Sequence, residues 1–60
     1  MTMGERIQSL RTGCGLSQEQ LAGLVGVSRQ AVSKWERSEA IPDTNKLAAL
    51  AGALGTTADE

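Results

Sequence analysis

The stretch SQEQLAGLVGVSRQAVSKWER, residues 17–37, decides the fold of this chain. It contains two helix starts, each opened by a serine, Ser17 and Ser28, whose hydroxyl can accept hydrogen bonds from first-turn amides. Only Gly26 and Val27 separate the first helix from the second serine. So short a link turns the chain sharply, and glycine can adopt the positive φ that the turn needs. The stretch therefore predicts two helices that pack across each other.

Apolar residues in this stretch recur at the spacing of a buried helix face. The residues that we expect inside are Leu21, Ala22, Leu24, Val25, Val27, Val32 and Trp35. A polar face then remains outside on the second of the two helices, made of Arg29, Gln30, Ser33, Lys34 and Arg37.

Helix signals continue on both sides of this stretch. Thr2–Glu5 has the pattern of a capping box, with a hydroxyl residue followed three positions later by a glutamate. Ile7 and Leu10 follow it on one helix face, and the glycines of residues 13–15 predict where that helix ends. We therefore expect a first helix ahead of the pair.

A fourth helix is expected after Pro42, with Asp43 as its N-cap and Gly55 at its end. Its apolar face consists of Leu47, Leu50, Ala51 and Leu54. Residues 57–60 form a third capping-box pattern, which predicts a fifth helix truncated where the sequence stops. The fold class is therefore all-α, a compact four-to-five-helix bundle that forms one domain over residues 1–60.

The composition argues against several classes of protein. The hydrophobic residues, 40% of the chain, include one Trp and no Phe or Tyr, which disfavours strands. No apolar stretch approaches the roughly 18 residues of a membrane span, and we expect neither a leader nor a membrane partner. A lone cysteine, Cys14, cannot form an internal disulfide, so a cytoplasmic location fits.

Catalysis and metal binding are also disfavoured. The chain has no His and one Cys, too few for the usual zinc ligand sets, so we expect no metal and no cofactor. Its seven acidic residues show no paired-carboxylate or nucleophile–base spacing. We therefore expect no enzyme and find no sign of a small-molecule site.

The outward face of the helix that follows Ser28 carries side chains that can recognise DNA bases. Arginine can pair bidentately with guanine and glutamine with adenine in the major groove, and Arg29 and Gln30 lie in the first helical turn, which reaches base edges. Ser17, Gln18 and Ser28 lie at helix N-termini, where exposed amides suit phosphate oxygens. These residues predict sequence-specific binding to double-stranded DNA.

The chain also resembles the phage-repressor (Cro/repressor, XRE-type) helix-turn-helix family. The matching segments are Leu10-Arg11, residues 15–22, residues 26–37, Ile41-Pro42-Asp43 and Leu54-Gly55. The resemblance implies a bacterial or phage-type transcriptional regulator that binds palindromic operators as a homodimer. It implies base readout by Arg29, Gln30, Ser33 and Lys34, and phosphate contacts from Gln18, Arg37, Asn45 and Lys46 as well as from the capping serines. Antitoxin-like and restriction-controller roles belong to the same class.

An ion pair between Arg11 and Glu36 is a further expectation. The family often joins these positions, and both residues flank inward ones, Leu10 and Trp35, so that their charged ends should emerge near the same edge of the core. A guanidinium can hold a carboxylate with two parallel hydrogen bonds, which fixes orientation as well as distance.

Several residues depart from the family pattern, and the net charge of the chain weakens the prediction of DNA binding. Ser38 stands where glycine is common, which predicts a looser end to the third helix, and Gly13, Gly23 and Gly52 are poor helix formers. The net charge is −1, although five of the six basic residues are expected on or next to the DNA side and only Glu39 opposes them there. The alternative function is a protein-interaction module that keeps the fold without the DNA affinity.

Overall fold

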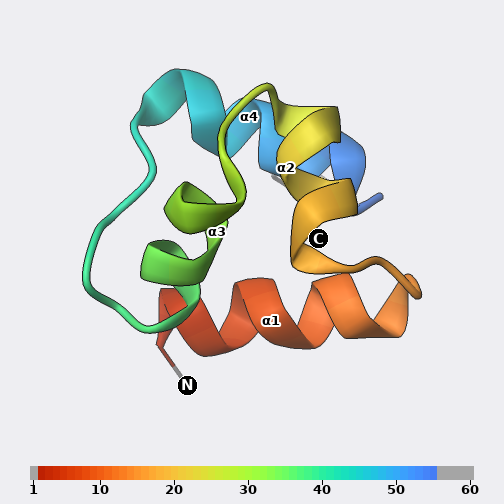
Figure 1. Ribbon diagram of the computed structural model, residues 1–60, viewed down its shortest axis with the longest axis horizontal. Coiled ribbons are helices and arrows are strands. Elements are labelled where there is room, and N and C mark those ends of the chain that lie inside the picture. Colours follow the sequence, from red (N-terminus) through yellow and green to blue (C-terminus); the bar gives the residue numbers. More distant parts are fainter. Residues whose placement is uncertain (1, 56–60) are drawn as a thin grey trace.

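The computed structural model describes residues 2–55 of the chain, and they form four α-helices (Figure 1). The helices are α1 (Met3–Gly13), α2 (Gln18–Val25), α3 (Arg29–Glu36) and α4 (Thr44–Ala53). Residues 2–55 contain no strand, so the all-α prediction is confirmed. The fifth helix expected over residues 57–60 falls outside the described residues.

Each helix begins directly after the residue predicted to cap it. The side-chain oxygens of the four N-caps accept hydrogen bonds from the amide three residues on, at 3.1 Å for Thr2, 3.0 Å for Ser17, 3.2 Å for Ser28 and 2.9 Å for Asp43. Thr2 and Ser17 head complete capping boxes. Local hydrogen bonding therefore sets the helix starts, because each cap satisfies an amide that the helix itself leaves unpaired.

The two sharp turns around α3 use left-handed backbone. Gly26 ends α2 with φ 84°, which glycine adopts without steric penalty. Ser38, just after α3, has φ 61°, and the amide of Glu39 donates to the carbonyl of Lys34 at 2.8 Å. The expectation of a looser turn at Ser38 is therefore wrong: the tight turn is kept, and a serine adopts the strained conformation.

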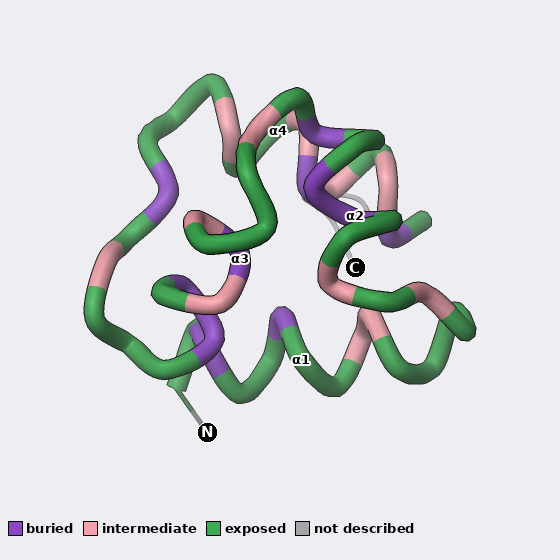
Figure 2. The backbone as a smooth tube through the Cα atoms, in the orientation of Figure 1, coloured by how far each residue is buried: buried purple, intermediate pink, exposed green. Residues whose placement is uncertain are grey.

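The core lies where α2 crosses α3, between α1 and α4 (Figure 2). Its buried members are Ile7, Leu21, Ala22, Val25, Val32, Trp35, Leu50 and Leu54. Leu21 and Val32 have no exposed surface, and Val27 packs partly buried against this cluster. The prediction of an aliphatic core with a single inward Trp is confirmed.

Two leucines expected inside lie at the surface. Leu24 is 61% exposed, because at 100° per residue it lies about 100° from the centre of the buried face of α2. Leu47 is on the apolar face of α4 but is 39% exposed, because it lines an open apolar groove between α1 and α4. None of the helices among residues 2–55 is both long and apolar enough to cross a membrane.

A close backbone approach fixes α1 against the end of α3. Gly4 is buried, and a Cβ built there would clash with the carbonyl oxygen of Trp35 and lie 2.6 Å from that of Glu36. Every residue except glycine would push the helices apart at this point. Gly4 therefore lets α1 brace the C-terminal end of α3.

Candidate nucleic-acid interface

A hydrogen-bonded joint, made of the side chains of Arg11, Gln18 and Glu36, fixes the position of α3. The Nε of Arg11 donates to Oε2 of Glu36 at 2.6 Å, and its Nη2 donates to Oε1 at 3.2 Å. The side chains are 12% and 4% exposed, respectively. Arg11, near the end of α1, thus binds the last residue of α3 through two hydrogen bonds, which fix the orientation of the two helices as well as the distance between them.

The same joint includes the start of α2. Gln18 donates from Nε2 to Oε1 of Glu36 at 3.0 Å, and Arg11 donates from Nη1 to the carbonyl oxygen of Leu16 at 2.7 Å. Glu36 therefore ties α1, α2 and α3 together. Among residues 2–55, no buried side-chain nitrogen or oxygen lacks a hydrogen-bond partner. A satisfied network of this kind favours one arrangement of the helices.

The outer face of α3 carries the four residues expected to read bases. Arg29, Gln30 and Lys34 are exposed, and Ser33 is half-buried. Val32 and Trp35 are buried on the opposite side of the same helix, so this helix is amphipathic. The polar side chains therefore project from a helix whose position is fixed by the core and by the Glu36 joint.

The expected phosphate contacts begin at the N-termini of α2 and α3. Ser17 and Ser28 are exposed N-caps, and first-turn amides of a helix have no partner within the helix. Gln18 is half-buried and its side-chain amide is bonded to Glu36. A phosphate contact from Gln18 would thus use its backbone amide or the second N–H of the side chain.

The remaining expected contacts lie beyond the end of α3. Arg37 is exposed, and its Nη2 lies 3.2 Å from Oε1 of Glu39. Asn45 and Lys46 are in the first turn of α4, with Asn45 exposed and Lys46 half-buried. Glu39 thus offsets the charge of one of the cations expected to face DNA.

Three features of this region were not foreseen from the sequence. These are the Gln18–Glu36 bond, the Arg37–Glu39 pair and the need for glycine at position 4. The first and third join different helices and leave no local pattern. Only the pair at positions 37 and 39 has a signal in the sequence, opposite charges two residues apart at a helix end.

Two short helices joined through a left-handed glycine, the second with a polar outer face and a buried inner one, define a helix-turn-helix domain. A sequence profile described as helix-turn-helix matches residues 7–60. The chain belongs to this family.

Several known proteins are similar to the chain in sequence. It is 43% identical over 60 residues to the HTH-type transcriptional activator BcrR of Enterococcus faecalis, covering 100% of this chain and 29% of that protein. It is 46% identical over 57 residues to Repressor protein C2 of Salmonella phage P22, covering 95% of this chain and 26% of that protein. The chain therefore spans less than a third of the length of these two relatives.

Solved structures share the fold. The P22 c2 repressor in complex with a synthetic operator has a TM-score of 0.93 and 44% identity to the chain, covering 98% of this chain and 89% of that one. The restriction-modification controller protein C.AhdI from Aeromonas hydrophila has a TM-score of 0.87 and 40% identity, covering 92% and 83%. The prediction of a phage-repressor-like fold is confirmed.

Proposed function

We propose that this chain is the DNA-binding domain of a bacterial or phage-type transcriptional regulator. It binds double-stranded DNA sequence-specifically, with α3 in the major groove. The observation that carries the proposal is the outward polar face of α3, held at a fixed angle by the core and by the Arg11–Glu36–Gln18 joint. Similarity to a repressor whose structure was solved in complex with a synthetic operator supports it.

Base readout belongs to the outer face of α3. Arg29 and Gln30, exposed in the first turn, form bidentate hydrogen bonds with guanine and adenine edges, respectively. Ser33 and Lys34 lie a turn further along and contribute contacts deeper in the site. The four side chains come from one rigid element, so a single docked position presents all of them to the bases.

Phosphate contacts position this reader on the duplex. Ser17, Gln18 and Ser28 supply the N-termini of α2 and α3, and Arg37, Asn45 and Lys46 supply donors beyond the C-terminal end of α3. These contacts supply affinity without sequence information, so their effect weakens as salt rises.

The wider biology follows from this mode of binding. The chain acts as a homodimer on a palindromic operator and works in the cytoplasm, associated with the nucleoid when bound to DNA. Its mechanism is occupancy of the operator, without catalysis. Its known relatives include both an activator and a repressor, so either outcome of occupancy fits this fold.

The test is selection of duplexes from a random pool with the purified chain, followed by titration of the selected duplex at several salt concentrations. We expect a defined consensus and an affinity that falls with salt, with a log–log slope of about −0.9 per neutralised phosphate. An absence of binding to any duplex at low salt would instead support the protein-interaction module.

A further inference from the structure

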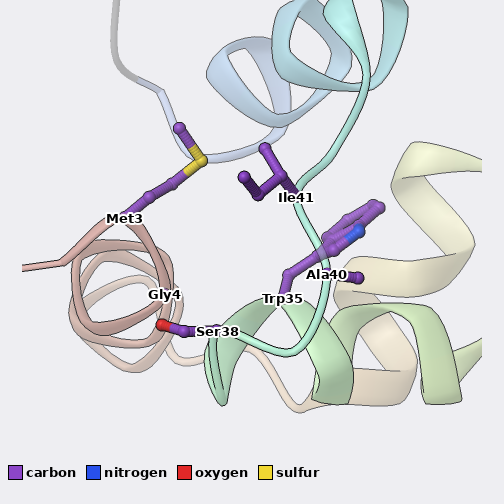
Figure 3. Close-up of a pocket in the computed structure, with 6 residues that line it drawn as sticks. All are labelled: Met3, Gly4, Trp35, Ser38, Ala40 and Ile41. Atoms are coloured by element: carbon purple, nitrogen blue, oxygen red, sulfur yellow. The ribbon is translucent and has the colours of Figure 1, made fainter.

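The C-terminal end of α3 borders an open apolar cleft of about 220 Å³ (Figure 3). The cleft is lined by Met3, Gly4, Trp35, Ser38, Ala40 and Ile41. None of these residues belongs to α2, so α2 does not pack against this side of the end of α3. The position of the helix end therefore depends on contacts other than the packing of side chains in the cleft.

Among residues 2–55, a single hydrogen bond joins a side chain of α2 to a side chain of α3. Its donor is Nε2 of Gln18, the first residue of α2, and its acceptor is Oε1 of Glu36, the last residue of α3, at 3.0 Å. The opposite ends of these two helices are joined by the turn at Gly26. The helix pair is thus closed at one end by the chain itself and at the other end by this hydrogen bond.

We propose that Gln18 is a positioning residue that determines sequence specificity, because its side chain holds the angle between α2 and α3 through Glu36. The inference rests on the proposed function and goes beyond a phosphate contact. Backbone amides at the N-terminus of α2 bind a phosphate, while side chains of α3 reach the bases. The angle between the two helices therefore decides whether the side chains of α3 meet the base edges when the phosphate is bound.

The alternative role for the Gln18 side chain is a direct contact with phosphate. Gln18 is half-buried, and its amide already donates to Glu36, whose side chain is 4% exposed. Turning this donor toward a phosphate would break a charge-assisted hydrogen bond and leave a largely buried carboxylate with one partner fewer. The side chain of Gln18 therefore stays bonded to Glu36 when DNA binds.

The first test compares Gln18→Met with the parent on two duplexes, the one selected by the parent chain and one of random sequence. Methionine has a similar length and helix propensity but no hydrogen-bond donor. We expect the ratio of the two affinities to fall about tenfold, roughly the discrimination that one bidentate base contact carries. The affinity for the random duplex should stay unchanged. Both titrations are made well below the melting temperature of the variant, so that all molecules are folded.

Gln8→Met is the matched control, since Gln8 is exposed on α1 and its side chain makes no hydrogen bond with the other residues of the range 2–55. It should match the parent on both duplexes. Equal losses of affinity on the two duplexes for Gln18→Met would overturn the proposal and make this side chain a phosphate ligand, because phosphate contacts act uniformly across sequences. An unchanged ratio, with or without a lower melting temperature, would also overturn it.

A second test needs no DNA, so the inference and the proposed function can fail separately. Residual dipolar couplings of the backbone N–H groups give the angle between α2 and α3 in the free chain. We expect this angle to shift in Gln18→Met and to stay at the parent value in Gln8→Met. An unchanged angle in Gln18→Met would refute the inference even if the parent bound DNA. A shifted angle in a chain that selects no duplex would retain the role of Gln18 in the helix pair and reject the proposed function.

Discussion

The carbonyl oxygen of Trp35 lies so close to Gly4 that no side chain fits between α1 and α3 at this point. Replacing Gly4 by Ala should therefore destabilise the domain by about 1–3 kcal/mol, since the clash with backbone exceeds the gain in helix propensity of at most about 1 kcal/mol. Urea unfolding followed by circular dichroism measures the change.

The same substitution should have the opposite effect at two other helical glycines. A Cβ at Gly23 or Gly52 meets nothing within 4 Å, and neither residue has a positive φ. Gly23→Ala and Gly52→Ala should each raise the free energy of unfolding by roughly 0.5–1 kcal/mol. A Gly4→Ala variant as stable as these two would show that α1 and α3 can move apart freely.

The Arg11–Glu36 pair should dominate the stability of the joint. Both side chains are largely buried, so Arg11→Ala or Glu36→Ala strands a charge and costs about 3–5 kcal/mol, comparable to the whole stability of so small a core. Either single variant should melt far below the parent or fail to fold.

The double variant, with both Arg11→Ala and Glu36→Ala, shows whether the two side chains stabilise the fold as an interacting pair or independently. It should lose less stability than the two single losses summed, because no unpaired charge remains. Thermal melts of all four proteins give the coupling energy. Additive losses, or single variants that melt like the parent, would mean that the two side chains do not depend on each other.

Ser38 should be a site where glycine stabilises the fold. Its φ of 61° lies in the region that is strained for residues with a Cβ. Ser38→Gly removes that strain but adds freedom to the unfolded chain, so we expect a net gain of about 0.5–1 kcal/mol in thermal or urea unfolding.

Ser38→Ala is the matched control, because it keeps the Cβ and removes the hydroxyl. The hydroxyl makes no hydrogen bond with other residues in the range 2–55, so this variant should stay close to the parent. A Ser38→Gly variant no more stable than Ser38→Ala would show that the turn is not strained.

Much of the fold was predictable because its main signals are local. Each N-cap is a short polar residue whose partner amide is three positions on, and both Gly26 and Trp35 follow from neighbouring spacing. The burial of Leu24 was predicted wrongly because helical spacing alone does not say how wide the buried face is. That width depends on which helices cover α2, which is a property of the whole bundle.

The candidate interface was predictable in outline for the same reason. Once α3 is amphipathic, the residues between its buried positions must face outward, Arg29 and Gln30 among them. The Gln18–Glu36 bond joins residues on different helices, so no spacing rule indicates it. The assignment of Gln18 to a phosphate remains a prediction, and the structure adds a role within the joint.

Glu39 should restrain DNA binding through Arg37. The side chain of Arg37 is 59% exposed and that of Glu39 is 54% exposed. Because exposed ion pairs contribute little to folding stability, Glu39→Gln should leave the thermal melt unchanged. On DNA, the substitution frees the guanidinium and removes a carboxylate that repels phosphate. We expect severalfold tighter binding at low salt and a salt dependence steeper by about one phosphate contact.

This measurement should use a duplex that carries a single half-site of the selected consensus. On such a duplex one copy of the chain binds, so contacts between two copies make no contribution. Glu19→Gln is the control: it changes the net charge equally, but Glu19 lies in the first turn of α2 and has no ion pair with Arg37. Its effect should be smaller and should leave the salt slope near that of the parent. Equal gains from both variants would trace the effect to overall charge and would remove Arg37 from the expected phosphate contacts.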